Sequence, residues 1–140
     1  MKPIKTTQIT GVWSYLETVD WSDPWFSALL AFHLLTFLIT FITRNKQMIL
    51  AGHFIALLLC VYMAETLNEF AANNWKMFSR QQYFDSKGMF ISLVWSAPIL
   101  LNCLLIVMMW ILTSSQLMVT NGRLKLLADR RATDKEKKKN

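Results

Sequence analysis

The chain has 140 residues, of which 54% are hydrophobic and only 17% are charged, and its formal net charge is +6. The high apolar content excludes an intrinsically disordered chain, which has too few apolar residues to bury. Four glycines and three prolines are too few for a collagen-like or low-complexity chain.

The apolar residues lie in three stretches without charge, at 24–43, 47–64 and 88–122, which contain 20, 18 and 35 residues. A transmembrane helix needs about 20 mostly apolar residues. Since the third stretch exceeds one crossing, we expect only 89–112 of it to span. We therefore predict an all-α membrane protein with three transmembrane helices. The alternatives are a two-span hairpin and a soluble bundle, whose core the few polar residues would not cover.

The N-terminal segment 1–23 carries apolar residues at helical spacing among several tryptophans, which predicts a short interfacial helix. Ser22-Asp23-Pro24 combines a capping side chain with a first-turn proline. The first transmembrane helix is therefore expected at 24–43. A polar turn at Arg44-Asn45-Lys46 leads into the second.

The second span, 47–64, is followed by a polar stripe at helical spacing, and no residue there breaks a helix. It is expected to extend to Phe78, and 83–88 is typical of an interfacial turn. In the third span, Pro98 predicts a kink near residues 94–98, because proline lacks the N–H that a helix interior uses.

Residues 113–140 form a basic tail, in which Asn121-Gly122 predicts a helix stop and the charge-dense end from residue 130 is expected to be disordered. The tail contains eight Lys/Arg and three Asp/Glu from residue 123 onward, or +5 of the net charge. Such cations bind anionic lipid surfaces or the phosphates of DNA. They are Arg123, Lys125, Arg130, Arg131, Lys135, Lys137, Lys138 and Lys139.

With three spans, the first loop and the tail share one side and hold ten Lys/Arg, whereas the N-terminus and the second loop hold five. The positive-inside rule then places the tail in the cytoplasm or nucleoplasm. The final Lys137-Lys138-Lys139-Asn140 matches a dilysine retrieval signal of endoplasmic reticulum membrane proteins, a match that also arises by chance in a lysine run.

Few polar groups lie in or beside the spans, and ionisable groups there are candidates for function. A metal or proton site at His33 and His53 is one interpretation, and hydrogen bonding between helices is the favoured one. The two acids after the second span, Glu65 and Glu69, are expected to pair with Lys76, Arg80 or the first helix, or to face a partner subunit. These candidates are His33, His53, Glu65, Asn68, Glu69 and Asn102.

Small residues recur at four-residue spacing along the second helix, which favours close packing against another helix of the chain or of a second molecule. They are Gly52, Ala56, Cys60 and Ala64. The sequence shows no metal-ligand spacing and no catalytic constellation. We therefore expect no enzyme activity and no cofactor, and partners among the lipid bilayer, DNA and other membrane proteins, self-association included.

Several motifs together resemble the transmembrane protein 18 family. The resemblance covers about residues 18–112 and is most specific in the second loop. It is carried by Asp20-Trp21-Ser22-Asp23-Pro24-Trp25, His33, Gly52-His53-Phe54, the stripe Glu65, Asn68 and Glu69, Asn74-Trp75, Gln82-Tyr83-Phe84-Asp85-Ser86, Gly88-Met89-Phe90-Ile91-Ser92, Ser96-Ala97-Pro98 and Asn102.

The resemblance implies a three-span protein of the nuclear envelope. It further implies a basic C-terminal region that binds DNA, represses transcription and carries a nuclear-targeting signal, and a role in the migration of neural cells. A second interpretation, which spacing and composition favour, is a small membrane scaffold or assembly subunit acting through its helix faces and second loop.

Overall fold

The structure is a computed structural model that describes residues 11–84 and 88–140. The first ten residues of the expected interfacial segment and residues 85–87 of the expected turn lie outside this part of the chain. The chain divides into two compact units, residues 1–104 and 105–140. The described residues form helices and no strand.

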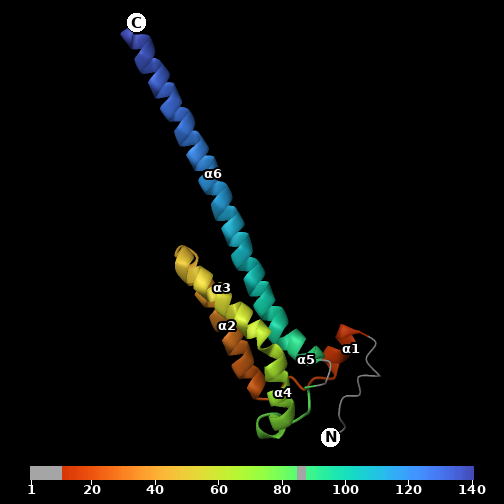
Figure 1. The fold of residues 1–140 in the computed structure, drawn as a ribbon. Coiled ribbons are helices and arrows are strands. Elements are labelled where there is room, and N and C mark those ends of the chain that lie inside the picture. The colour runs from red at the N-terminus through yellow and green to blue at the C-terminus, as the bar shows by residue number, and fades with distance from the viewer. Residues whose placement is uncertain (1–10, 85–87) are drawn as a thin grey trace. The chain divides into compact units, whose positions relative to one another are not determined.

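Helices α2 (Trp25–Thr43) and α3 (Gln47–Tyr62) form an apolar hairpin in the first unit (Figure 1). Helix α1 (Val12–Glu17) precedes them. The expected capping of α2 is wrong, because no side chain caps this helix and Pro24 occupies the N-cap position. The backbone carbonyl of Asp23 accepts from the Phe26 N–H at 3.1 Å. The Asp23 carboxylate does not cap the helix and is available for contacts elsewhere.

A bend of 49° separates α3 from the next helical segment, α4 (Ala64–Asn74) with the 3-10 turn η2 (Trp75–Met77). The sequence predicted no break here. In a continuous helix the carbonyl of Cys60 accepts from the N–H of residue 64. The Trp95 indole instead donates to that carbonyl at 2.9 Å. A side chain inserted into the hydrogen-bond ladder is a recognised cause of helix bends.

The third apolar stretch begins with a short turn of α-helix, α5 (Met89–Ile91), which follows Gly88 in the left-handed conformation. It continues as the π-helical turn η3 (Ser92–Ser96) into α6 (Ala97–Lys139). The irregularity predicted at Pro98 is therefore a π-helical turn just before it. Such turns are rare and concentrate at functional positions.

Helix α6 corrects two expectations about the tail, because it continues through Asn121-Gly122 and through the charge-dense end to Lys139. Gly122 has ordinary helical geometry, and glycine costs only about 1 kcal/mol relative to alanine in a helix interior. The residues after it are mostly Leu, Lys, Arg, Ala and Glu, which are strong helix formers. High charge density alone therefore does not melt this segment.

Two helical stretches are long and apolar enough to cross a membrane, Trp25–Thr43 and Met89–Lys139, and the bent pair of α3 with α4 and η2 makes a third if it acts as one span. The described chain is thus an all-helical protein with two to three candidate membrane-spanning helices. The expected all-α membrane class is confirmed at that level.

Candidate functional site

A buried carboxylate joins the start of α2 to the second loop. Asp23 is only 2% exposed, and its Oδ2 accepts from the Arg80 backbone N–H at 2.8 Å, the Ser79 hydroxyl at 3.2 Å and the Tyr83 hydroxyl at 3.3 Å. The Arg80 Nε lies 3.9 Å from Asp23 Oδ1. Because a buried charge is tolerated only when it is paired and hydrogen-bonded, these donors fix the loop onto the start of α2.

The phenol of Tyr83 belongs to the same cluster. Burial, and next the charge of Asp23, raise the pKa of Tyr83 to about 12. The hydroxyl therefore keeps its proton at neutral pH and acts as a donor toward Asp23 and toward the Asp20 carbonyl, which lies 3.2 Å away. Asp20 itself is exposed, and hydrogen bonds from Ser22 lower its pKa.

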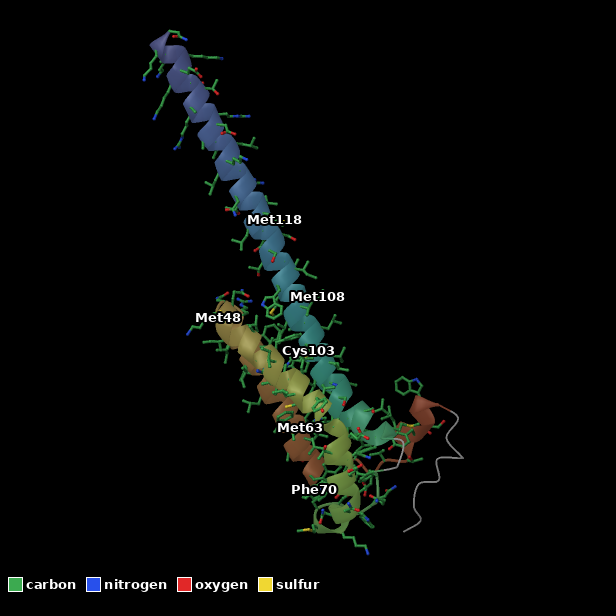
Figure 2. The ribbon with its side chains drawn as sticks, in the orientation of Figure 1. Met48, Met63, Phe70, Cys103, Met108 and Met118 are labelled. Carbon is green, nitrogen blue, oxygen red and sulfur yellow. The ribbon has the colours of Figure 1, made fainter. Side chains whose placement is uncertain are left out.

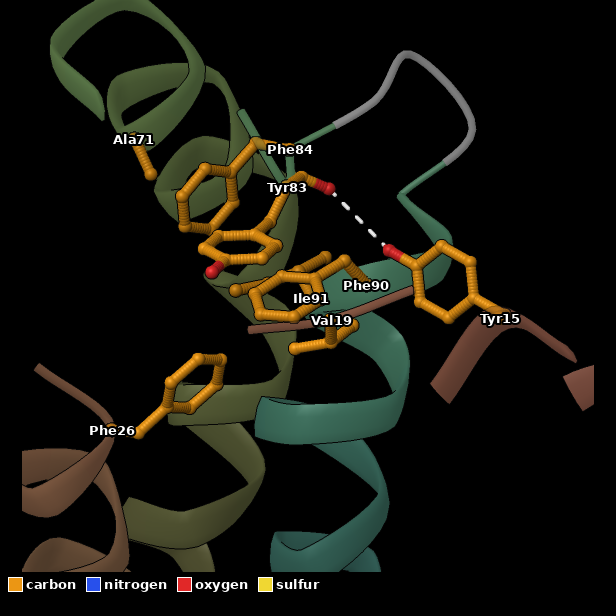
Figure 3. Close-up of a cluster of buried hydrophobic side chains, with 8 residues drawn as sticks. All are labelled: Tyr15, Val19, Phe26, Ala71, Tyr83, Phe84, Phe90 and Ile91. Carbon is orange, nitrogen blue, oxygen red and sulfur yellow. Dashed lines mark hydrogen bonds between the residues drawn. The ribbon is translucent and has the colours of Figure 1, made fainter. Parts of the chain in front are cut away.

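Tyr83 also belongs to a buried hydrophobic cluster that is rich in aromatic rings, called the aromatic cluster below (Figure 3). The rings of Tyr83 and Phe90 stack with centroids 4.9 Å apart, and the Tyr15 hydroxyl donates to the Tyr83 carbonyl at 3.4 Å. Aromatic pairs of this kind add about 0.5–1.5 kcal/mol each beyond their buried area. The buried members are Tyr15, Val19, Phe26, Ala71, Tyr83, Phe84, Phe90 and Ile91.

His33 meets the backbone of the π-helical turn. It is buried, with an exposed fraction of 8%, and its Nε2 lies 2.8 Å from the Val94 carbonyl. A carbonyl oxygen only accepts, so Nε2 carries the proton. In a regular helix this carbonyl pairs with the N–H of residue 98, which is proline here. His33 thus supplies the donor that Pro98 lacks.

His53 takes part in a second network, which links α3, α2 and α6. Its Nε2 lies 3.2 Å from the Thr36 carbonyl and 3.1 Å from Thr40 Oγ1, and the Thr40 hydroxyl lies 2.8 Å from its acceptor, Asn102 Oδ1. Asn102 is fully buried. Interhelical hydrogen bonds of this kind contribute about 0.6–2 kcal/mol each in a membrane.

The two histidines contact different carbonyls, His33 that of Val94 and His53 that of Thr36. Within residues 11–84 and 88–140, no group of three His, Cys, Asp or Glu side chains could hold a metal ion. The polar groups of the spans therefore act, in this structure, as connections between helices.

The acids of the polar stripe do not make the expected ion pairs. Glu65 and Glu69 are exposed on α4, whereas Asn68 between them is buried. Arg80, which was expected to pair with them, contacts Asp23 instead. Asp23 lies in a water-poor cluster with its partners, where an ion pair is less screened than at the surface.

The small residues of the second helix divide into two pairs. Gly52 and Ala56 are exposed on α3, and no atom lies within 4 Å of a Cβ built at Gly52. Cys60 and Ala64 are half-buried near the bend, where the Cys60 carbonyl accepts from Trp95 and Ala64 packs against the aromatic cluster. Only the second pair therefore packs within the chain as expected.

The basic residues of the tail all lie on a single exposed helix. Every residue from Ser114 to Asn140 is exposed, and the ion pair between Arg80 and Asp23 is the only one within the described residues. Arg123, Arg130 and Lys137 recur at every seventh position, so they share one face of α6.

Sequence reasoning missed the roles of Asp23, Arg80, Tyr83 and Trp95. The neighbours of Asp23 in the sequence indicate local capping, whereas its partners in the structure lie in the second loop. A usable signal was present for Asp23, because a carboxylate next to an uncharged stretch at the bilayer boundary needs donors, and the second loop supplies them. Nothing in the sequence indicates the contact of Trp95 with Cys60.

Comparison with known proteins extends these observations. The profile of the family described as Transmembrane protein 18 matches residues 14–131. The chain is similar to Transmembrane protein 18 of Danio rerio, at 53% identity over 104 residues, covering 74% of this chain and 68% of that protein. It is similar to Transmembrane protein 18 of Xenopus laevis, at 44% identity over 131 residues, covering 92% and 94%. No solved structure matches significantly. The family resemblance drawn from the sequence motifs is confirmed.

Replacing Asp23 by Asn tests the buried carboxylate. The variant keeps the size of the side chain but removes its charge and places an amide N–H₂ among other donors. An unsatisfied buried group of this kind typically lowers the free energy of unfolding by about 1–3 kcal/mol. We expect lower thermal stability in detergent and faster tryptic cleavage after Arg80. The matched control is Asp20→Asn, since Asp20 is exposed in the same segment. Equal effects of both substitutions would contradict a special role for Asp23.

Proposed function

The chain belongs to the transmembrane protein 18 family, and from this premise we propose that it is a multi-pass protein of the nuclear envelope and endoplasmic reticulum that presents a basic helix to nucleic acid. The observation that carries the proposal is the exposed end of α6, which holds eight Lys/Arg and three acidic residues from residue 123 onward. Binding of DNA there would support transcriptional repression at the membrane, and the role in cell migration implied by the resemblance would follow from it.

The proposed topology has three spans. In this interpretation α3 and α4 together make one bent crossing, α1 lies at the interface, and the first and third crossings are α2 and the helix from Met89. An odd number of crossings puts the termini on opposite sides. The excess of Lys/Arg in the first loop and tail then favours a tail on the cytoplasmic or nucleoplasmic side.

Glycosylation mapping tests this topology. One variant carries an added Asn-x-Thr sequon near Thr7, and another carries a sequon in an extension after Asn140. We expect modification at the N-terminal site alone, because only lumenal asparagines meet the transferase. Enzymatic deglycosylation is the control for the mobility shift. Modification at the C-terminal site alone would reverse the orientation and remove the tail from the nucleoplasm.

The basic helix suits charge-driven binding to a polyanion. Arg123, Arg130 and Lys137 form a stripe, and Arg131 and Lys138 lie one position beyond two of them. Each cation that neutralises a phosphate releases a counterion, so affinity falls with salt. The single helix carries no paired recognition element that would position it in a groove, and we therefore expect phosphate contacts rather than base reading.

Salt-dependent binding of duplex DNA tests this proposal with the full chain in nanodiscs of neutral phosphatidylcholine, so that the bilayer does not compete. The logarithm of affinity is expected to fall linearly with the logarithm of salt concentration. The triple variant Arg123→Gln, Arg130→Gln and Lys137→Gln should lower the slope by about 0.9 for each phosphate that is no longer neutralised.

The chain offers a matched control of equal charge in Lys125→Gln, Lys135→Gln and Lys139→Gln, which lie away from the stripe. We expect this control to keep more of the affinity and more of the salt dependence than the stripe variant. Equal reductions would show diffuse attraction without a binding face. Unchanged binding in both variants, or strong preference for one duplex sequence, would contradict the proposal.

A second candidate function is an assembly subunit or scaffold, and the exposed small residues of α3 favour it. Gly52 and Ala56 are exposed on α3, and no atom of the described chain beyond the neighbouring backbone lies within 4 Å of a Cβ built at Gly52. Small residues four positions apart let two membrane helices approach closely. Glu65 and Glu69 are also exposed, on α4, and acids at the end of a span need a protein, water or headgroup partner.

Added bulk on this face tests the scaffold. Gly52→Leu with Ala56→Leu should reduce co-purification of partners or self-association, measured as native size in mild detergent, while membrane insertion stays normal. The control is Leu58→Phe, which adds bulk to an exposed residue elsewhere on α3. Unchanged native size and partners in the double variant would argue against this candidate.

A further inference from the structure

A groove of about 450 Å³ opens between three helical segments of the first unit. Each wall is a helix face, because its lining residues recur at helical spacing. Helix α2 contributes Ala28 and Phe32, α4 contributes Leu67 and Phe70, and the third apolar stretch contributes Ile91 of α5 with Val94 and Trp95 of η3. The volume falls in the range of about 300–1,000 Å³ that is typical of ligand sites.

Trp95 lines this groove and also contacts the backbone beside the bend at Met63. Trp95 donates its indole N–H to the Cys60 carbonyl just before the bend, and its ring stacks on Phe32 with centroids 5.0 Å apart. Trp95 is thus held on two sides, and it forms a fixed wall of the groove. Phe70, labelled on α4 in Figure 2, also lines the groove and is 65% exposed.

The chemistry of the lining identifies the class of occupant. The side chains of the groove are apolar or aromatic and belong to segments that extend from candidate spans, so hydrocarbon is the medium that meets them. Acyl chains are the hydrocarbon that a bilayer supplies. Membrane helices approach one another closely through small residues, whereas six of the twelve residues that line this groove are aromatic.

At the end of the groove where α2 begins, the lining includes one polar group, the indole N–H of Trp25. Trp25 contacts Phe78 and Phe84 edge to face or tilted, and these three rings line that end. The Trp25 indole N–H is buried and has no acceptor among the described residues. Tryptophan at a helix end lies at the depth of lipid esters and headgroups, so an ester carbonyl is an acceptor of the right kind.

A cation completes this arrangement. Arg80 follows Phe78 by two residues, and its side chain is 56% exposed. Its Nε is only loosely paired with Asp23 at 3.9 Å, while its backbone N–H holds the loop in place at 2.8 Å. The guanidinium therefore has free donors for a phosphate, which it binds in a bidentate geometry.

We propose that this groove is a binding site for one phospholipid molecule. An acyl chain lies along the faces of α2, α4 and η3, the ester carbonyl accepts from the Trp25 indole, and the phosphate contacts Arg80. The site is independent of the basic tail, so it stands whether or not the tail binds DNA.

Native mass spectrometry of the full chain in mild detergent tests the site with phosphatidylcholine as the probe. The unmodified chain should retain one phosphatidylcholine molecule. Ala28→Trp fills the groove from α2, and overpacking of this kind should weaken retention about tenfold. Ala31→Trp is the matched control, because Ala31 is exposed on the same helix and does not line the groove.

Two further arms separate the parts of the site. Ala28→Leu should weaken retention less than Ala28→Trp, which guards against a variant that merely fails to fold. Diacylglycerol, which lacks the phosphate, should be retained less than phosphatidylcholine, and Arg80→Gln should abolish that difference. No retained lipid on the unmodified chain, equally weakened retention in Ala28→Trp and Ala31→Trp, or no effect of Ala28→Trp would overturn the proposal.

Discussion

A bilayer offers no water to backbone carbonyls, and this constraint governs the first unit of the molecule. Two helices are interrupted, α3 at its bend and the third apolar stretch at its π-helical turn, and each interruption frees a carbonyl. The Trp95 indole donates to Cys60, and the His33 imidazole donates to Val94. Because each donor comes from a different helical segment, satisfying the backbone also joins the segments together.

A related constraint applies at the start of α2, where the buried polar group is a side chain. The carboxylate of Asp23 accepts from two side chains and one backbone N–H of the second loop, and aromatic rings exclude water around them. The loop therefore has a defined position over the start of α2. Phe78 and Phe84, on either side of these donors in the sequence, contact Trp25, so one buried charge helps to organise this end of the first unit.

The apolar helices that are candidates for crossing the membrane could be predicted from sequence, because the length of an uncharged apolar stretch is a local property. The bend and the buried cluster could not, since their decisive partners are distant: 35 residues separate Trp95 from Cys60, and 61 separate His33 from Val94. Asp23 illustrates the error, because its neighbours in sequence suggested a cap while its partners in space lie in the second loop. The tail differs from the expectation for another reason, because the helix propensity of its Leu, Lys and Arg residues outweighs the effect of its charge density.

The separation of Asp23 from its partners has a consequence for biosynthesis. The donors follow Asp23 by 56, 57 and 60 residues, so they leave the ribosome after α2 and α3 have been made. Until then the carboxylate has no protein donor and remains hydrated, because burial without a partner is strongly unfavourable. The aromatic cluster can thus close only after the second loop has been delivered to the same side of the membrane as the N-terminal segment. In a chain whose second loop lies on the other side of the membrane, Asp23 stays hydrated and the aromatic cluster does not form. Formation of this cluster therefore depends on correct insertion of the chain.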